Sequence, residues 1–253
     1  MAHYQIILAY DGTAFQGYQR QKSVRTVQGE VEAALRRLNW AGAAVTCAGR
    51  TDTGAHALGQ VIACDLDWPH SENELGRALN ALLPVDVAVR SVKLAEPGFH
   101  PRYSAKARTY QYHIYCQVDR NPLRERYAWR VWPEVELQLL QQAAQALVGN
   151  HDFAAFGKPP RPGGSTRRTV DAACWQPEAE GLQFEVTANA FLYHMVRRMV
   201  FLQVLVGQNH LSLHELAGLV QAEGAAQMQT PGIAPAHGLV LAEVKYGEQE
   251  DLK

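Results

Sequence analysis

The sequence predicts an α+β fold, because strand-like and helix-like segments follow one another in the same order twice along the chain. Residues 1–103 read as strand, helix, strand, strand, helix, strand, and residues 104–253 repeat that order. Both halves match the ferredoxin-like β-α-β-β-α-β unit, which has an antiparallel sheet covered by helices. Two such halves are expected to leave a cleft between them, which is a usual place for an active site.

In the first half, Thr26 is expected to cap a helix, because apolar residues recur at helical spacing after it. Ser71 and Glu74 form a capping box for a second helix. Four segments rich in β-forming residues predict the strands of this half: residues 3–10, 45–48, 60–66 and 85–89.

The second half has the same kinds of signal. The period of the apolar residues predicts helices over 134–147 and 191–206, and a third begins near Ser212. Gly149 is a plausible C-cap for the first of these helices. Strands are expected at four places in this half: residues 103–118, 172–176, 182–187 and 239–245.

Composition excludes several classes of protein. The four cysteines form no Cys-x-x-Cys pair, so neither a zinc site nor a disulfide framework is indicated, and reduced thiols favour a cytoplasmic protein. The N-terminus lacks the pattern of a signal peptide. The longest apolar stretch, 191–206, is broken by charged and polar residues, which indicates a core helix rather than a membrane span.

The net charge of −1 alone argues against a nucleic-acid partner, but the basic residues are clustered. Segment 153–170 contains no Asp or Glu and looks like a mobile loop at the expected cleft. Local positive patches supply the phosphate contacts of nucleic-acid-binding proteins, although solvated surface arginines are an equally good interpretation of any one cluster. The basic residues of this segment are Lys158, Arg161, Arg167 and Arg168, and two further clusters comprise Arg102, Lys106 and Arg108, and Arg120, Arg124, Arg126 and Arg130.

Asp52 lies in a loop of small residues between two expected strands, with Gly49 and Gly54 on either side. Such an Asp can close the turn, bind a metal or attack a substrate. Arg197 shares one face of its expected helix with Tyr193, Val200 and Val204, which places it on an apolar stripe. A buried arginine is costly without a carboxylate partner. If that partner is Asp52, the pair would keep the Asp ionised; the alternative is that Arg197 reaches solvent.

Tyr110 and Tyr112 share one face of an expected strand beside Arg108, and can stack on a base or simply pack in a sheet. His210 and His214 are one helical turn apart but have no evident third ligand, so no metal site is expected. No P-loop or dinucleotide fingerprint occurs, and nothing in the sequence calls for a cofactor.

Together these motifs resemble the TruA family of tRNA pseudouridine synthases along nearly the whole chain. The most specific matching segment is Gly49-Arg50-Thr51-Asp52. Other segments follow in the order of the family: Tyr10-Asp11-Gly12-Thr13, Ala107-Arg108-Thr109-Tyr110, Gly149-Asn150-His151-Asp152-Phe153, Ala188-Asn189-Ala190-Phe191, His194-Met195-Val196-Arg197 and His237-Gly238-Leu239.

The resemblance implies an enzyme that isomerises uridine to pseudouridine at positions 38–40 of tRNA, in the anticodon stem-loop. It implies that Asp52 is catalytic, that Tyr110 lies against the target base and that Arg197 pairs with the Asp. It also implies a homodimer that needs neither a metal nor an organic cofactor. The expected RNA contacts are Arg20, Arg50, His56, Arg108, Lys158, Arg161, Arg167 and Arg168.

Three alternatives remain open from the residues alone. A non-catalytic RNA-binding protein would not need Asp52 or Arg197. An aspartate-dependent glycosidase or nucleosidase usually needs a second carboxylate, which the Asp52 loop does not supply. A pseudouridine synthase for another RNA site is the nearest alternative.

Overall fold

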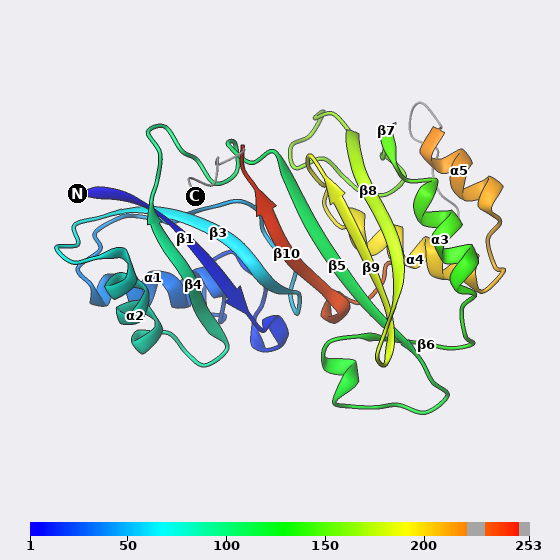
Figure 1. The fold of residues 1–253 in the computed structure, drawn as a ribbon, viewed down its shortest axis with the longest axis horizontal. Coiled ribbons are helices and arrows are strands. Elements are labelled where there is room, and N and C mark those ends of the chain that lie inside the picture. Colours follow the sequence, from blue (N-terminus) through cyan, green and yellow to red (C-terminus); the bar gives the residue numbers. More distant parts are fainter. Residues whose placement is uncertain (222–230, 248–253) are drawn as a thin grey trace, which may run out of the picture. The chain divides into compact units, whose positions relative to one another are not determined.

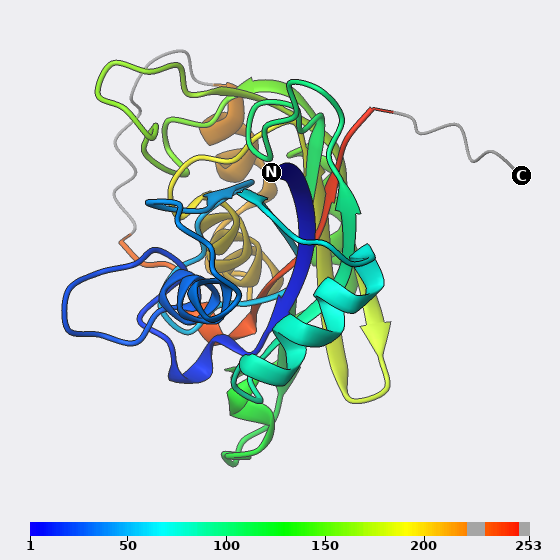
Figure 2. The ribbon, with the colours of Figure 1, turned by 90° about the vertical axis from the view of Figure 1, so that its left-hand side faces the viewer.

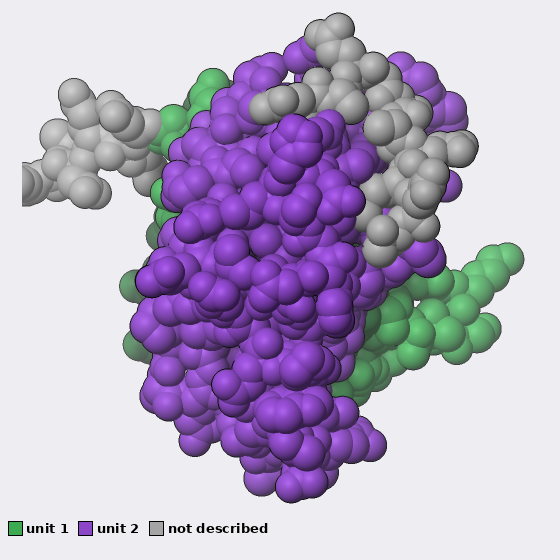
Figure 3. All heavy atoms as spheres, turned by 90° about the vertical axis from the view of Figure 1, so that its right-hand side faces the viewer, with its two compact units in different colours: residues 1–106, 240–253 green, residues 107–239 purple. Residues whose placement is uncertain are grey.

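The computed structural model describes residues 1–221 and 231–247 of the chain. The chain forms two compact units, distinguished by colour in Figure 3. Unit 1 comprises residues 1–106 and 240–253, and unit 2 comprises residues 107–239. The fold is mixed α and β, with strands that are mostly antiparallel, as the sequence predicts.

Unit 1 is a sheet with two helices, α1 and α2, which contact each other (Figures 1 and 2). In the sheet, β1 lies between β4 and β3 and pairs antiparallel with both. β3 also pairs antiparallel with β2 and parallel with β10. The elements are β1 (Ala2–Tyr10), a 3₁₀ turn (Gly12–Ala14), α1 (Val27–Arg37), β2 (Thr46–Cys47), β3 (His56–Leu66), α2 (Glu72–Leu82), β4 (Val87–Leu94) and β10 (Leu239–Lys245).

The core of unit 1 follows from the alternation of side chains along these strands. Ile6 on β1 lies opposite Ile62 on β3, and neither side chain is exposed. Leu35 of α1 and Leu75 of α2 are also fully buried, because each lies on the apolar stripe of its helix. The sheet and both helices therefore enclose one apolar core.

Unit 2 has a sheet in the order β5-β9-β8-β7, in which all neighbours are antiparallel, and β6 is added parallel to β5. Helix α3 packs on β8 and contacts both α4 and α5 (Figure 1). The elements are β5 (Ala107–Cys116), a 3₁₀ turn (Arg124–Arg126), β6 (Trp129–Val131), α3 (Leu137–Gln145), β7 (Gly149–Asp152), β8 (Arg167–Glu178), β9 (Gly181–Ala188), α4 (Met195–Gly207), α5 (Leu213–Gln221) and a 3₁₀ turn (Ala236–Gly238).

The core of unit 2 is aromatic. Trp175 on β8 packs its ring 5.2 Å from that of Phe184 on β9. Its indole Nε1 donates a hydrogen bond of 2.8 Å to Gln203 Oε1 on α4, so the buried polar atom is satisfied. This bond fixes α4 against the sheet.

Several local predictions are confirmed. Thr26 caps α1 by accepting a hydrogen bond from the Gly29 amide at 3.3 Å. Ser71 and Glu74 form the expected capping box of α2. α5 begins directly after Ser212. Among the described residues, no helix is long and apolar enough to cross a membrane.

Other predictions differ from the structure. The expected helix over 191–206 begins only at Met195, because His194 has a left-handed backbone with φ of 65°. The helix expected over 134–147 is confined to α3, and Gly149, with φ of 120°, begins β7 instead of capping the helix.

The expected division at residues 103 and 104 lies close to the observed one, but the last strand belongs elsewhere. We expected residues 239–245 to complete the second half. In the structure, Val240 and Leu241 of β10 pair in parallel with His56 and Ala57 of β3, so this strand extends the sheet of unit 1. Pairing between strands so far apart in the sequence leaves no local signal.

Candidate active site

Asp52 lies on a tight turn that connects β2 to β3 in unit 1. Its backbone carbonyl accepts a hydrogen bond of 3.1 Å from the Ala55 amide, which closes a four-residue turn. Gly54, the third residue of the turn, has φ of 81°, a conformation that glycine adopts without steric cost. The half-buried Asp52 is thus the first residue of a defined turn.

The segment after β1 holds this turn in place. The Tyr18 amide donates to the Thr51 carbonyl at 3.1 Å, and the Gly54 amide donates to the Phe15 carbonyl at 3.3 Å. Gly17, with φ of 83°, approaches so closely that a Cβ atom would lie 3.1 Å from Thr51 O. A Cβ at Gly12 would lie 1.9 Å from Ala55 O. Both glycines therefore allow two backbone segments to touch.

His56 follows the turn and lies in the interior of unit 1, with 5% of its surface exposed. The Gly12 amide donates a hydrogen bond of 3.0 Å to His56 Nδ1. Asp11 Oδ1 lies 3.2 Å from the same nitrogen, but a bond between them would need a proton on Nδ1. We favour the unprotonated Nδ1, because the Gly12 amide always carries its proton. Through this hydrogen bond, His56 connects the Asp52 turn to the segment after β1.

Arg20 and Arg50, which we expected to contact RNA, have different surroundings. Arg20 Nη1 forms an ion pair with Glu32, whose side chain is fully buried in α1, and Nη2 donates to the Ala43 carbonyl at 3.2 Å. Glu32 also accepts from Gln28 Nε2 at 2.8 Å. Arg20 therefore compensates a buried carboxylate while its own side chain stays 44% exposed, and Arg50, two residues before Asp52, is also exposed.

In unit 2, Tyr110 and Tyr112 of β5 have different roles. The ring of Tyr110 lies 5.0 Å from that of Phe191 in an edge-to-face arrangement. Tyr112 is fully buried, and its hydroxyl donates a hydrogen bond of 2.6 Å to the Pro235 carbonyl. Burial raises the pKa of Tyr112 well above its usual range. Tyr112 is a core residue, and the half-buried Tyr110 is the better candidate for contact with a base.

Arg197 lies in the first turn of α4 and is only partly buried. Its Nε donates to the Ala234 carbonyl at 2.7 Å, and the Ala234 amide donates back to the Arg197 carbonyl at 3.1 Å. The next residue, Arg198, is 8% exposed, and its Nη1 donates to the Gly232 carbonyl. Burial lowers the pKa of the Arg198 guanidinium.

The burial of Arg198 was not predicted. The expected stripe grouped Arg197 with Tyr193 because both were placed in one helix. Tyr193 precedes α4 and is 60% exposed, so that stripe does not exist at its N-terminal end. The sequence holds no separate signal for Arg198, because its partner is a backbone carbonyl.

The segment 189–193 gathers several of the predicted RNA contacts of unit 2. Arg108 Nη1 donates to the Asn189 carbonyl at 2.7 Å, and Phe191 contacts Tyr110. The Tyr193 amide donates to the Lys158 carbonyl at 2.9 Å. The guanidinium of Arg108, the backbone of Lys158 and the ring of Tyr110 therefore lie around one short segment.

The other basic residues of the 158–168 segment are mostly at the surface. Arg161 and Arg167 are exposed. Arg168 is half-buried, its Nη1 donates to the Ser165 carbonyl at 2.9 Å and to the Arg167 carbonyl at 2.6 Å, and burial lowers its pKa. Arg161 and Arg167 therefore lie where a phosphate can approach them from solvent.

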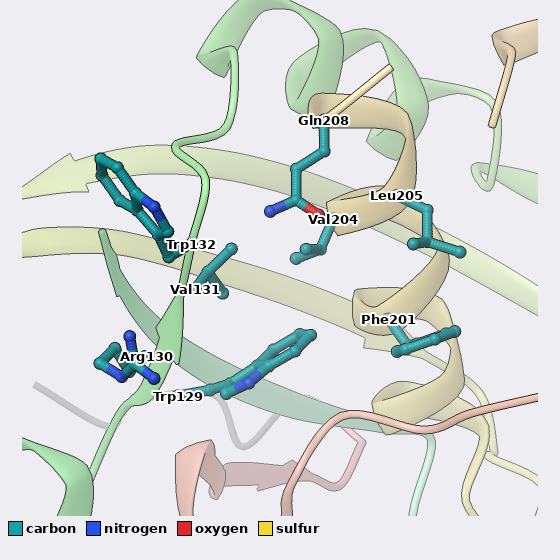
Figure 4. Close-up of a pocket in the computed structure, with 8 residues that line it drawn as sticks. All are labelled: Trp129, Arg130, Val131, Trp132, Phe201, Val204, Leu205 and Gln208. Carbon is teal, nitrogen blue, oxygen red and sulfur yellow. The ribbon is translucent and has the colours of Figure 1, made fainter. Parts of the chain in front are cut away.

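A separate aromatic pocket lies between β6 and α4 in unit 2 (Figure 4). None of the predicted catalytic residues lines it. Over residues 1–221 and 231–247, no group of three or more His, Cys, Asp or Glu side chains is placed to hold a metal ion. The residues that line the pocket are Trp129, Arg130, Val131, Trp132, Phe201, Val204, Leu205 and Gln208.

Unit 1 holds a carboxylate on a fixed turn, and unit 2 gathers basic and aromatic residues around one segment. Basic residues beside aromatic rings are typical of proteins that bind single-stranded nucleic acid. Residues 6–104 and 143–247 match the family model of tRNA pseudouridine synthase. The chain therefore belongs to the tRNA pseudouridine synthase family.

Individual relatives agree with the family model. The chain is 38% identical over 242 residues to tRNA pseudouridine synthase A of Shouchella clausii, covering 95% of this chain and 92% of that protein. It is 38% identical to the protein of the same name from Maridesulfovibrio salexigens, covering 98% and 92%. The corresponding protein of Bacillus subtilis is 36% identical, covering 94% and 97%.

Proposed function

We propose that this protein isomerises uridine to pseudouridine in the anticodon stem-loop of tRNA, at positions 38, 39 and 40, with Asp52 as the catalytic residue. Family membership supports the reaction. The observation that carries the assignment of the residue is the Asp52 turn, whose neighbours Thr51 and Gly54 are both hydrogen-bonded to the segment after β1. A carboxylate that only closed a turn would not need two crowded glycines to support it.

The reaction needs few chemical groups. The bond between uracil N1 and ribose C1′ breaks, the base turns, and C5 bonds to C1′. C5 loses a proton and N1 gains one, so no atom is lost overall and no acceptor is needed. Asp52 forms an adduct with C1′ or with C6 of the base, or assists formation of a glycal. Each route requires an ionised carboxylate held at a fixed place.

We assign Tyr110 to stacking on the extruded uracil and Arg197 to pairing with Asp52. Phe191, at the edge of the Tyr110 ring, would hold that ring in place. A uridine in a stem must first flip out, which costs a few kcal/mol that stacking and phosphate contacts offset. We propose Arg50, Arg108, Lys158, Arg161, Arg167 and Arg168 for those contacts. Arg20 pairs with the buried Glu32 and, with its side chain 44% exposed, stays a candidate for such a contact, whereas His56 supports the Asp52 turn through the Gly12 amide.

We further propose that the two units correspond to two ferredoxin-like halves. In unit 1, the chain order β1-α1-β2-β3-α2-β4 and the sheet order β4-β1-β3-β2 are those of this unit. In unit 2, β5, α3, β8, β9 and α4 follow the first five elements of that order with antiparallel neighbours, and the strand that comes next in the chain, β10, lies in unit 1.

We also propose that the protein is a cytoplasmic homodimer, an expectation that comes from the resemblance and from the free cysteines. Sedimentation equilibrium is expected to give twice the 28.1 kDa of one chain. A mass of 28.1 kDa at micromolar concentration would contradict the dimer but would leave the reaction untouched.

The reaction is tested by tritium release from an anticodon-arm tRNA transcript labelled at uridine C5. The wild type is expected to release tritium, and Asp52→Asn is expected to be at least about 1,000-fold slower while tRNA binding stays largely intact. Asp67→Asn is the matched control, because this carboxylate is 91% exposed. Release by both Asp52→Asn and the wild type would remove Asp52 from the mechanism. Free uracil as the product would instead identify a nucleosidase.

A further inference from the structure

Three polar side chains in the interior of unit 1 connect to the Asp52 turn. Tyr10 of β1 shares a hydrogen bond of 2.8 Å between its hydroxyl and Thr51 Oγ1. Gln60 of β3 donates from Nε2 to the Gly49 carbonyl at 2.8 Å, and the same nitrogen lies 3.5 Å from the Tyr10 hydroxyl. Tyr10 is 5% exposed, Thr51 is 8% exposed and Gln60 is not exposed.

We propose that Tyr10, Thr51 and Gln60 are positioning residues for Asp52, which set the rate of isomerisation and leave RNA binding unchanged. The inference rests on the proposed function, because it takes Asp52 as the catalytic group. None of the three is expected to touch the substrate, since their hydrogen bonds hold residues 49–51 and so act on Asp52 only through its position.

The network fixes the residue directly before Asp52 on two sides. The side chain of Thr51 is bonded to Tyr10, and its carbonyl accepts from the Tyr18 amide at 3.1 Å. Rotation of Thr51, which would swing the Asp52 carboxylate, must therefore break one of these buried bonds. Through Gly49, Gln60 fixes the chain three residues before Asp52.

The polar groups of Tyr10, Thr51 and Gln60 indicate a role other than packing of the core. An apolar core needs no hydroxyl or amide, and buried polar groups are costly unless they are bonded. The Gly49 carbonyl needs a donor, so the amide of Gln60 must present Nε2 to it. Gln60 Oε1 is then buried without a hydrogen-bond partner. The side chain thus keeps its bond to the Asp52 turn although its other polar atom is unsatisfied.

The network can be tested with two substitutions at one residue. Thr51→Val keeps the shape of the side chain and removes the hydroxyl, whereas Thr51→Ser keeps the hydroxyl. The single-turnover rate at saturating tRNA is measured together with the Kd for tRNA and the melting temperature. For Thr51→Val we expect a rate about 10- to 100-fold lower with an unchanged Kd, and for Thr51→Ser a rate close to that of the wild type.

Tyr10→Phe provides the second test, because it removes only the hydroxyl at the other end of the bond. We expect a similar loss of rate, and the double variant Tyr10→Phe with Thr51→Val is expected to lose little more than either single variant. If Thr51→Val does not fold, the single variant Tyr10→Phe carries the test.

The proposal is overturned if a folded Thr51→Val or Tyr10→Phe reacts at the wild-type rate, or if the loss appears in Kd. It is also overturned if Thr51→Ser is as slow as Thr51→Val, since the hydroxyl is then not the cause. Failure of the wild type to release tritium would overturn the proposed function itself. If the wild type is active and the variants react at the wild-type rate, only the proposed role of Tyr10, Thr51 and Gln60 is overturned.

Discussion

At the scale of single residues, a comparison of two glycines in unit 1 distinguishes the cost of a left-handed backbone from the cost of a close neighbouring segment. Gly17 and Gly98 both have left-handed backbones, with φ of 83° and 77°. A Cβ at Gly17 would crowd Thr51 and Thr53 of the Asp52 turn, whereas a Cβ at Gly98 would meet nothing within 4 Å. Any difference between alanine at the two positions therefore reports the contact with the turn.

We expect Gly98→Ala to lower the free energy of unfolding by about 1–2 kcal/mol through strain alone, with normal isomerisation by the folded protein. Gly17→Ala should be more destabilising and should also slow the single-turnover rate, because the Asp52 turn must shift. Urea unfolding and tritium release measure the two effects. Equal rates for the two folded variants would show that the turn tolerates the displacement.

At the scale of elements, a clamp joins the loop before α1 to the loop before β4. The guanidinium of Arg25 donates two hydrogen bonds to Asp86, at 2.6 and 2.8 Å, and lies over the ring of Phe15. Arg25 holds the pKa of Asp86 below its usual value of 3.8. The Asp86 carbonyl also accepts from the Asp11 amide at 3.0 Å, so the clamp borders the segment that supports Asp52.

This lowered pKa predicts a pH dependence of stability. The stabilisation is fully present above the unfolded-state pKa and is lost as pH falls through the lower pKa of the folded state. We expect about 0.5–1 kcal/mol, because Arg25 is partly exposed and the pair is screened by solvent. Asp86→Asn should remove this part of the acid dependence in urea unfolding, and the control Asp119→Asn on an exposed loop should keep it. The same acid slope in both variants would contradict the assignment.

The elements also show what the sequence can and cannot predict. Thr26 and the capping box at Ser71 act on neighbours within one turn, so the residues alone identify them. The start of α4 depends on the left-handed backbone of His194 and on the bond between the Tyr193 amide and the Lys158 carbonyl. These tertiary contacts start the helix at Met195, although the spacing of apolar residues that predicts a helix continues back to residue 191.

The candidate site divides in the same way. The residue types and spacing around Asp52 were sufficient to make it the candidate catalytic residue. The partners of Arg20 and His56 were not predictable, because Glu32 and the Gly12 amide become their neighbours only in the folded unit. A basic residue in the sequence predicts a positive charge, but only the folded structure shows whether that charge is paired with a carboxylate of the protein.

At the scale of the whole molecule, the chain leaves unit 1 at residue 106 and returns to it at residue 240. The return is made by β10, which pairs with the first residues of β3, directly after the Asp52 turn. Gly59 of β3 permits this pairing, because a Cβ there would lie 2.4 Å from Ala242 O. The end of the chain thus supports the strand that carries the candidate catalytic turn.

We therefore expect Gly59→Ala to displace β10, to speed amide hydrogen exchange in that strand and to lower both the melting temperature and the isomerisation rate. Gly76→Ala is the control, because a Cβ in α2 would make only ordinary contacts, 3.6 Å from Val92, and alanine should stabilise the helix by about 0.5–1 kcal/mol. If β10 stays protected from exchange in Gly59→Ala, the close approach is dispensable. If β10 is released and the rate is unchanged, the Asp52 turn holds its position through the segment after β1 alone.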